Sequence, residues 1–396
     1  MRVALLSRSA HPLHPPGGLE RAVYQLAVHL QRRGVETVLF TRPATEAGTF
    51  PGPVVHVPYG HFGRHGSVLD RTLSYPPFAA RLGAAVAEQV RKGAIDVVDA
   101  QGLTALGYGR LRGRDPALRA PLVMNPQGME EHQTRGLKRA ALWRLRRLSR
   151  AAARLADRVV ATDEATRADV PRLLGVPAEK VVVLPNGIDL DEVARLTPAE
   201  PRARAEEAVP ALRTAGLVIL SVGRLEPYKG FDTAAAALAR LQSAGALPAD
   251  WAWVVVGAGG AGAAWRAWLP GRLHLTGRVD EATLHALYAR ADVFLHATRF
   301  EGSSLVTLEA MAHALPVVAT RAGGIPDKVV EGRTGALAEP GDAEALAEAL
   351  RPLVAQPDLR REMGRQGRAR VEERFAWSAL VERTLALYQE LVAAAR

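Results

Sequence analysis

Short apolar runs alternate with longer amphipathic stretches along most of this chain, and the runs fall into two series. Runs rich in Val, Leu and Ile predict buried strands, and the stretches between them have the period of helices. The first series predicts strands at 2–7, 35–40, 54–57, 95–99, 121–125, 158–162 and 181–184. The second predicts strands at 217–222, 253–257, 273–276, 293–296 and 316–320. This alternation is typical of doubly wound parallel sheets, so we expect an α/β fold with two Rossmann-like domains.

The segment 197–216, TPAEPRARAEEAVPALRTAG, separates the two series and is rich in Pro, Ala and charge. Such a composition favours a connection between domains. We therefore place one domain at 1–197 and a second at 205–376, followed by a last segment at 377–396.

The composition indicates what kind of partner the chain binds. Its 396 residues include 51 Lys and Arg against 41 Asp and Glu, a net charge of +10, and no Cys. An anionic partner fits this charge, and a nucleotide, a lipid surface and a nucleic acid are all candidates. The first apolar run is too short for a signal peptide and no stretch reaches the roughly 20 apolar residues of a spanning helix, so we expect a cytoplasmic protein.

The stretch 300–325, FEGSSLVTLEAMAHALPVVATRAGGI, is the candidate centre of the chemistry. It predicts a loop with Glu301, a helix over 303–313 with Glu309, a strand, and a turn at Gly323 and Gly324. The start of such a helix offers unbonded backbone N–H groups and the positive end of the helix dipole. A phosphate would bind there.

The two glutamates of this stretch suggest an elongated ligand. Eight residues of helix advance about 12 Å, so Glu301 and Glu309 could contact two places on one molecule. A nucleotide with a group beyond its phosphates has that shape. The alternative is an amphipathic helix with both glutamates in solvent and with its apolar side in the core, at Leu305, Leu308 and Ala312.

The segment 221–230, SVGRLEPYKG, runs from a predicted strand into two cationic side chains, Arg224 and Lys229. Their spacing lets both reach one ligand at the edge of the sheet, where Arg can clamp a diphosphate and Lys can add a point charge. Such a pair would stabilise a negatively charged leaving group. The alternative is two surface charges without a ligand.

Glycines mark two further turns. Gly257, Gly259 and Gly262 match G-x-G-x-x-G, but too few residues precede the next predicted strand for a crossover helix. A turn that faces a nucleotide is the more economical interpretation. Gly17 and Gly18 follow the first predicted strand, so their turn lies on the ligand-binding edge of the first sheet.

A D-x-D pattern at Asp189 and Asp191 offers two carboxylates of the kind that can hold a metal and a nucleotide sugar elsewhere. Here it directly follows an apparent turn at 185–187. We therefore expect no metal at these positions.

The segment 137–158 has a basic and an apolar side when its residues are placed 100° apart. The apolar side holds Leu137, Ala141, Leu145, Leu148, Ala152 and Leu155. Opposite lie Trp143 and Arg139, Arg146, Arg147, Arg150, Arg154 and Arg158. An anionic membrane surface would suit this side, and a solvated basic face is the alternative. Interleaved aromatic residues are absent, so nucleic acid is not expected.

Taken together, these segments resemble the retaining glycosyltransferases of family four, which have the GT-B fold. The motifs are the Gly17–Gly18 turn, PNGID at 185–189, GRLEPYKG at 223–230, E-x7-E at 301–309, and EAMAHALPVVAT with AGGIPD up to 327. Each motif is loose, but their joint order is specific and covers nearly the whole chain. The resemblance implies two Rossmann-like domains whose parallel sheets face across a cleft, with 377–396 as a helix that crosses back to the first domain.

In that family the C-terminal domain holds a nucleotide diphosphate sugar, and the acceptor sits against the N-terminal domain. The resemblance implies that Arg224 and Lys229 hold the diphosphate and that Glu301 bonds hydroxyls of the donor sugar. Glu309 would bind the ribose. Further donor contacts are expected from Gly17, Gly18, Gly257, Arg278, Val279, Ser303, Ser304 and Leu305.

The acceptor side departs from the family pattern at one position. Many members have His before Gly after the fifth strand, whereas this chain has Gln127 before Gly128. Gln cannot act as a base, although it can still bond a sugar, and the nearby Glu130 could assist an acceptor.

The resemblance also implies a mechanism and partners. Transfer would retain the anomeric configuration, by front-side attack in which the leaving phosphate takes the proton of the acceptor hydroxyl, so no cofactor and no metal are expected. The basic segment 137–158 favours a lipid-linked acceptor or a peripheral site at the inner face of the membrane. The alternatives are an epimerase or phosphorylase of the same fold, an NAD-dependent oxidoreductase that uses the Gly257 turn, and a non-catalytic polyanion-binding protein.

Overall fold

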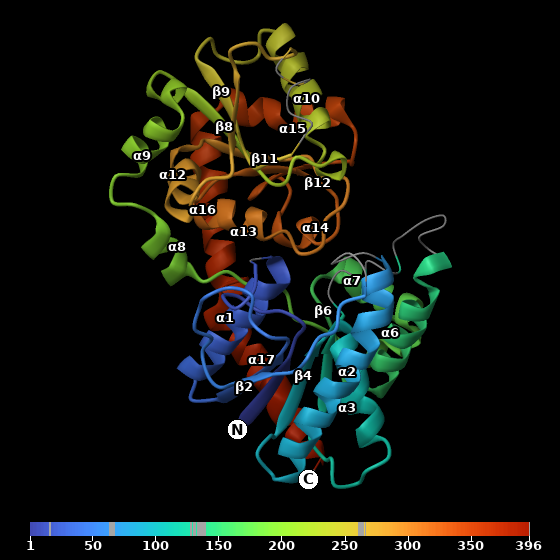
Figure 1. Ribbon diagram of the computed structural model, residues 1–396. Coiled ribbons are helices and arrows are strands. Elements are labelled where there is room, and N and C mark those ends of the chain that lie inside the picture. The colour runs from blue at the N-terminus through green and yellow to red at the C-terminus, as the bar shows by residue number, and fades with distance from the viewer. Residues whose placement is uncertain are drawn as a thin grey trace. The chain divides into compact units, whose positions relative to one another are not determined.

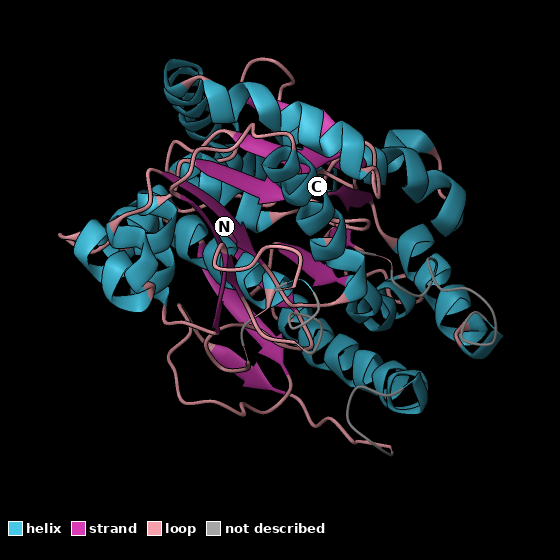
Figure 2. Ribbon diagram, turned by 90° about the horizontal axis from the view of Figure 1, so that it is seen from above, coloured by secondary structure: helices cyan, strands magenta, loops and turns pink. Residues whose placement is uncertain are grey.

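The computed structural model describes the chain except for residues 16, 63–67, 127–128, 130–131, 133–139, 260–264, 266 and 396, and except for the side chains of 68 and 69. The chain forms two compact units (Figure 1). The first unit comprises Met1–Asn186 and Leu380–Arg396, and the second comprises Gly187–Ala379. Figure 2 distinguishes the helices, in cyan, from the strands, in magenta.

The first unit contains a seven-stranded sheet in the order β3-β2-β1-β4-β5-β6-β7, and all its strand pairs are parallel. The strands are β1 (Arg2–Leu6), β2 (Glu36–Thr41), β3 (Val54–His56), β4 (Val97–Gln101), β5 (Leu122–Asn125), β6 (Arg158–Ala161) and β7 (Val181–Val183). Its helices are α1 (Gly18–Arg32), α2 (Val68–Arg91), α3 (Ala105–Arg112), α6 (Trp143–Leu155), α7 (Glu164–Val170) and most of α17 (Trp377–Ala395). Every predicted strand of the first series is present.

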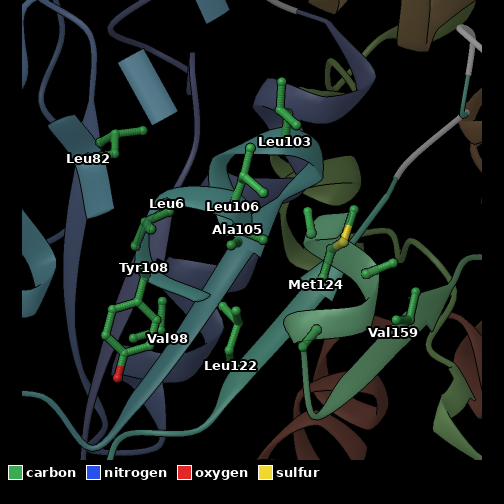
Figure 3. Close-up of a cluster of buried hydrophobic side chains, with 14 of the residues drawn as sticks. Leu6, Leu82, Val98, Leu103, Ala105, Leu106, Tyr108, Leu122, Met124 and Val159 are labelled. Atoms are coloured by element: carbon green, nitrogen blue, oxygen red, sulfur yellow. The ribbon is translucent and has the colours of Figure 1, made fainter. Parts of the chain in front are cut away.

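The helix α3 is packed tightly in this unit. Tyr108 of α3 lies with Leu6 of β1 and Val98 of β4 in one buried cluster (Figure 3). Its hydroxyl donates a hydrogen bond to the carbonyl of Ala120 at 2.8 Å. A Cβ atom on Gly107 would lie 1.9 Å from the carbonyl oxygen of Ala79, so only Gly lets α3 approach α2 this closely.

The second unit contains a six-stranded parallel sheet in the order β10-β9-β8-β11-β12-β13. Its strands are β8 (Leu217–Val222), β9 (Trp251–Val256), β10 (Leu273–Gly277), β11 (Val293–His296), β12 (Val317–Thr320) and β13 (Gly335–Ala338). The helices are α8 (Leu190–Leu196), α9 (Pro201–Ala208), α10 (Phe231–Ser243), α12 (Glu281–Arg290), α13 (Leu305–Ala312), α14 (Ile325–Lys328), α15 (Ala343–Ala355) and α16 (Pro357–Arg374). The five predicted strands are present, and β13 was not predicted.

Alternate residues of the second sheet face two separate cores. Val218 and Leu220 of β8 pack in one core, and Leu217 and Ile219 pack in the other. Successive side chains of a strand point to opposite faces, and a sheet buried on both faces has continuous apolar strands. This explains why the strands of this unit appear in the sequence as unbroken apolar runs.

The segment expected to be a connection between domains is folded. Within 197–216, α9 packs on α12, and Arg204 bonds Asp280 and Thr283 at 2.9 Å each. Ala205 of the same helix is fully buried. The polar composition of α9 reflects its exposed side, and the boundary between the two units lies earlier, at Asn186 and Gly187.

The C-terminal helix α17 begins at Trp377 in the second unit and belongs to the first unit from Leu380 onward. Tyr388 of this helix is fully buried and donates a hydrogen bond to Asp99 Oδ2 at 2.6 Å. Gln101 donates to the other oxygen of Asp99 at 2.8 Å. Burial raises the pKa of Asp99 to about 6, although both hydrogen bonds act to lower it.

This raised pKa predicts a pH-dependent stability. Between the unfolded pKa of about 3.9 and the folded pKa of about 6, the folded state binds more protons than the unfolded state. The free energy of unfolding should therefore fall by roughly 2 to 3 kcal/mol as the pH rises through this window. We expect Asp99→Asn to lack this loss. Urea unfolding at pH 4 and pH 7.5 measures the difference between the two proteins, and an equal difference at both pH values would contradict the assignment.

Candidate functional site

The strand order of the second unit determines where a ligand can bind. Beyond β8 the chain proceeds to β9 and β10 on one side, and it then returns to β11, β12 and β13 on the other. The chain therefore continues from β8 and from β11 to opposite sides, which makes the carboxyl ends of these two strands a topological switch point. Open α/β sheets bind ligands at such a switch point. Lys229 lies in the loop after β8, and Glu301 lies in the loop after β11.

Glycine lets the loop with Glu301 contact the turn after β12. Gly323 has a φ of +51°, and a Cβ atom there would lie 1.8 Å from the carbonyl oxygen of Glu301. The amide of Gly324 donates to the carbonyl of Gly302 at 3.1 Å. These backbone contacts hold Glu301 in place at the switch point.

Lys229 and His296 both contact one oxygen of Glu301. Lys229 Nζ lies 2.7 Å and His296 Nε2 lies 3.1 Å from Glu301 Oε2. The side chains of Lys229 and Glu301 are 14% and 15% exposed. Burial acts to raise the pKa of Glu301, but the hydrogen bond and charge of His296, followed by those of Lys229, outweigh it and lower the pKa to about 2. Glu301 is therefore an ionised acceptor at neutral pH.

Arg224 and Lys229 both lie near the ring of Tyr228. The Tyr228 ring centroid is 6.0 Å from the guanidinium of Arg224 and 5.4 Å from Lys229 Nζ. Arg224 also bonds the Tyr228 hydroxyl at 2.6 Å and pairs with Glu226 at 2.8 Å. Its side chain is 68% exposed, so it can exchange the Glu226 contact for a ligand at little cost.

The helix after Glu301 begins slightly later than predicted. Ser304 is the N-cap residue of α13, but its side chain makes no capping bond and instead contacts the Thr307 hydroxyl at 2.9 Å. The first amides of an α-helix have no partner inside the helix, so those at the start of α13 are directed to a ligand or to solvent. Leu308 and Ala312 are buried in the core, as expected for either interpretation of this helix.

Glu309 of α13 does not lie fully in solvent, unlike in the alternative interpretation of this helix. It is half-buried, and the Tyr288 hydroxyl donates to its Oε2 at 2.9 Å. The structure thus holds both glutamates of the E-x7-E motif by hydrogen bonds from side chains outside the motif.

A buried lysine, Lys328, lies beside Ser303. Lys328 of α14 is fully buried, and its Nζ lies 3.4 Å from Ser303 Oγ and 3.2 Å from the carbonyl oxygen of Gly324. The loop between β11 and α13 therefore has a lysine on each side, at Lys229 and at Lys328.

The glycine turn after β9 has a structural role. Gly257 has a φ of +145°, and a Cβ atom there would lie 1.9 Å from the carbonyl oxygen of Gly223. Its amide donates to the carbonyl of Gly277 at 2.9 Å. Arg278 and Val279 follow this contact, with Arg278 exposed and Val279 packed on the core. They lie after β10, two strands from β8, along the same carboxyl edge. Gly262 lies outside the described residues.

The predicted residues of the first unit are described only in part. Gly17 is the N-cap of α1, where a Cβ atom would lie 2.4 Å from Glu20 Oε2, and a Cβ atom on Gly18 would meet nothing within 4 Å. Gln127, Gly128 and Glu130 lie outside the described residues.

The basic segment 137–158 makes more contacts with the rest of the protein than we expected. Arg150 donates to the carbonyl of Leu173 at 2.9 Å, Arg154 donates to Gly175 at 3.4 Å, and Arg158 pairs with Glu390 at 2.9 Å. Arg150 and Arg154 thus fasten α6 to the segment 171–175, whereas Arg158 lies in β6, and the helical period alone could not reveal these contacts. Trp143 is 53% exposed, and the Arg147 guanidinium lies 5.6 Å from its ring centroid. Residues 137–139 lie outside the described part.

The D-x-D pattern forms a helix cap. Asp189 is the N-cap of α8, and its side chain accepts hydrogen bonds from the amides of Asp191 and Glu192. Within the described part of the chain, no three His, Cys, Asp or Glu residues gather in a way that could hold a metal ion. Across the same residues, none of the helices combines the length and the apolar character needed to span a bilayer.

Sequence reasoning missed three residues of this site. His296 interrupts an apolar strand five residues before Glu301, which was a signal that could have been noticed. Tyr288 and Lys328 gave no signal, because both reach the site only through the packing of α12 and α14.

Comparisons with known proteins decide the family. Residues 16–192 match the model described as Glycosyltransferase Family 4, and residues 216–356 match the model described as Glycosyl transferases group 1. The D-inositol 3-phosphate glycosyltransferase of Kineococcus radiotolerans is 32% identical over 99% of this chain and 95% of its own length. The chain belongs to glycosyltransferase family 4. It is therefore a glycosyltransferase, and the comparisons give no support to an epimerase, a phosphorylase or an oxidoreductase.

Solved structures show the same fold for this family 4 glycosyltransferase. Sucrose-phosphate synthase from Thermosynechococcus elongatus has a TM-score of 0.77 at 24% identity and covers 99% of each chain. Anabaena HepE in complex with UDP has a TM-score of 0.75 at 20% identity and covers 98% of this chain and all of that one. These likenesses confirm the GT-B fold that the sequence motifs implied.

The buried pair of Lys229 and Glu301 predicts energetic coupling. We expect Lys229→Met and Glu301→Gln to show a coupling of roughly 1 to 3 kcal/mol at pH 7, because each single change leaves a buried polar partner unmatched. Since the folded pKa of Glu301 is lowered to about 2, this contribution is present above pH 4.5 or so and is lost as the pH falls toward 2.

Urea unfolding of the native protein, both single variants and the double variant measures this coupling. The matched control is the exposed pair of Glu348 and Arg351 on α15, whose substitutions should be additive. Additive effects at Lys229 and Glu301 as well would contradict the coupling.

Proposed function

We propose that this protein transfers a sugar from a nucleoside diphosphate sugar to a hydroxyl acceptor with retention of the anomeric configuration. The observation that carries the proposal is the contact between Lys229 and Glu301 at the switch point. One loop there supplies a cation suited to a diphosphate, and the other supplies an ionised carboxylate suited to sugar hydroxyls. The similar structures of HepE are complexes with UDP and with UDP-glucose, and this supports a nucleotide sugar as the donor.

The donor-binding residues then have distinct roles. Lys229 and Arg224 hold the diphosphate, Glu301 accepts hydrogen bonds from the donor sugar, and Glu309 accepts them from the ribose. The amides at the start of α13 contact a phosphate or sugar oxygen. The remaining donor contacts are assigned to Gly17, Gly18, Gly257, Arg278, Val279, Ser303, Ser304 and Leu305.

Binding of the donor exchanges the partner of Lys229. In the free protein the ammonium of Lys229 is paired with Glu301. An arriving diphosphate carries more negative charge than one carboxylate, so it competes for Lys229. His296 still contacts Glu301 Oε2 and keeps the carboxylate in place. Glu301 is then available to the sugar hydroxyls, and Lys229 balances the charge of the leaving group.

The reaction follows from this arrangement. The bond between the anomeric carbon and the β-phosphate oxygen breaks, and a bond to the acceptor oxygen forms on the same face of the sugar. The proton of the acceptor hydroxyl passes to the departing phosphate oxygen. Fixed cations and amides that face a developing charge lower the barrier, and we expect them to serve without a metal ion.

The acceptor is proposed to be a hydroxyl of a polyol or a lipid-linked sugar, bound by the first unit. The 32% identical relative is named for glycosyl transfer involving D-inositol 3-phosphate, which supports a polyol. Gln127, Gly128 and Glu130 remain our candidates for the acceptor side.

Removing either cation should slow turnover. We expect Lys229→Ala and Arg224→Ala each to lower kcat by roughly 10²- to 10³-fold, the range for losing one preorganised contact to developing charge. Mass spectrometry of products, after a thermal-shift screen of UDP, GDP, ADP and dTDP sugars, measures the effect. Arg351→Ala on the surface of α15 is the control, and near-native turnover in both site variants would refute the proposed role.

We propose in addition that α6 contacts an anionic membrane surface. Trp143 is exposed beside Arg147, so an indole can enter the interface while arginines contact phosphates. Flotation with phosphatidylglycerol vesicles at low salt tests this contact. We expect Trp143→Ala to reduce flotation several-fold and Trp268→Ala, at a similarly exposed Trp of the second unit, to leave it unchanged. Absence of flotation by the native protein would exclude the contact.

A further inference from the structure

Aromatic side chains pack around the ring of Tyr288 and fix the direction of its hydroxyl. Tyr288 lies on α12, is fully buried, and stacks on the His313 ring with centroids 5.5 Å apart and planes 8° apart. The ring of Phe294 lies 5.8 Å from it. A phenol has only two rotatable bonds to its ring, so packing on two sides fixes the direction of its hydroxyl.

The ring of His313, which stacks on Tyr288, is uncharged at neutral pH. His313 Nε2 lies 2.9 Å from His285 Nδ1. Burial, followed by the nearby charges of His285 and Arg368, lowers the pKa of His313 to about 3. A neutral imidazole cannot compete with a ligand for the charge of Glu309. The hydroxyl of Tyr288 faces the carboxylate of Glu309, with 2.9 Å between the hydroxyl oxygen and Glu309 Oε2.

The hydroxyl of Tyr288 reaches two acceptors, and one contact is clearly the shorter. It lies 2.9 Å from Glu309 Oε2 but 3.4 Å from the carbonyl oxygen of Val306. A purely structural hydroxyl would be satisfied by the backbone carbonyl one turn away on α13. The shorter contact instead fixes the plane of the Glu309 carboxylate, which offers about four acceptor directions in all.

We propose that Tyr288 is a positioning residue that orients Glu309 toward the two adjacent hydroxyls of a ribose. This inference rests on the proposed function, because it assumes that a nucleoside diphosphate occupies the site. The oriented carboxylate makes the site selective for ribonucleoside over 2′-deoxyribonucleoside diphosphates. A site built to bond a hydroxyl rejects an analogue that lacks it, because the acceptor then loses its partner.

The test compares binding of ribonucleotide and deoxyribonucleotide. The variant Tyr288→Phe keeps the stack on His313 and removes only the hydroxyl. The matched control is Tyr108→Phe, which removes another buried hydroxyl that bonds a backbone carbonyl in the first unit. Calorimetry with UDP and 2′-deoxy-UDP, and with ADP and 2′-deoxy-ADP, gives a ratio of dissociation constants for each protein.

We expect the native protein and Tyr108→Phe to bind the ribonucleotide at least about tenfold more tightly than its 2′-deoxy analogue. In Tyr288→Phe the dissociation constant of the ribonucleotide should rise about five- to tenfold. That of the 2′-deoxy analogue should change less than about twofold, so the variant loses most of the selectivity. Equal weakening of both ligands, or an unchanged ratio, would show that the hydroxyl is only structural. That outcome leaves the proposed function standing, whereas a native protein that binds neither these four nucleotides nor GDP or dTDP overturns both.

Discussion

The donor site depends on one constraint, which is that a mostly buried lysine needs an anion beside it. A buried ammonium without a partner is costly, so Lys229 and Glu301 stabilise one another only if the loops after β8 and β11 meet. The sheet topology brings these loops together, because β8 and β11 are neighbouring strands. The glycine at 323 lets the second loop approach the turn after β12. The pair is thus positioned by the fold and is ready to exchange one anion for another.

Each acidic residue of the site has a dedicated neighbour. His296 contacts Glu301 from inside β11, and Tyr288 contacts Glu309 from α12. Catalytic and binding groups are precise when residues around them restrict their rotamers. Because both neighbours belong to a strand and a helix of the second unit, we expect the two carboxylates to keep their orientation in the proposed exchange of Lys229 to a phosphate.

The sequence predicted the strands correctly, and it named the two glutamates and the cation pair as candidates, because these features leave local signals of period and spacing. It missed β13, whose Gly335–Ala338 is short and rich in small residues, and it interpreted α9 as a connection. It also missed Tyr288 and Lys328. These features depend on contacts between segments far apart in the chain, such as Arg204 with Asp280, and a pattern within one segment carries no record of them.

We propose that Lys229 exchanges Glu301 for the donor diphosphate while His296 stays in contact with Glu301. A crystal structure of the protein with an intact nucleoside diphosphate sugar measures this directly. We predict that Lys229 Nζ lies within about 3.2 Å of a phosphate oxygen and that the contact between His296 and Glu301 is preserved. A donor bound with its diphosphate away from Lys229, and with the pair of Lys229 and Glu301 intact, would contradict it.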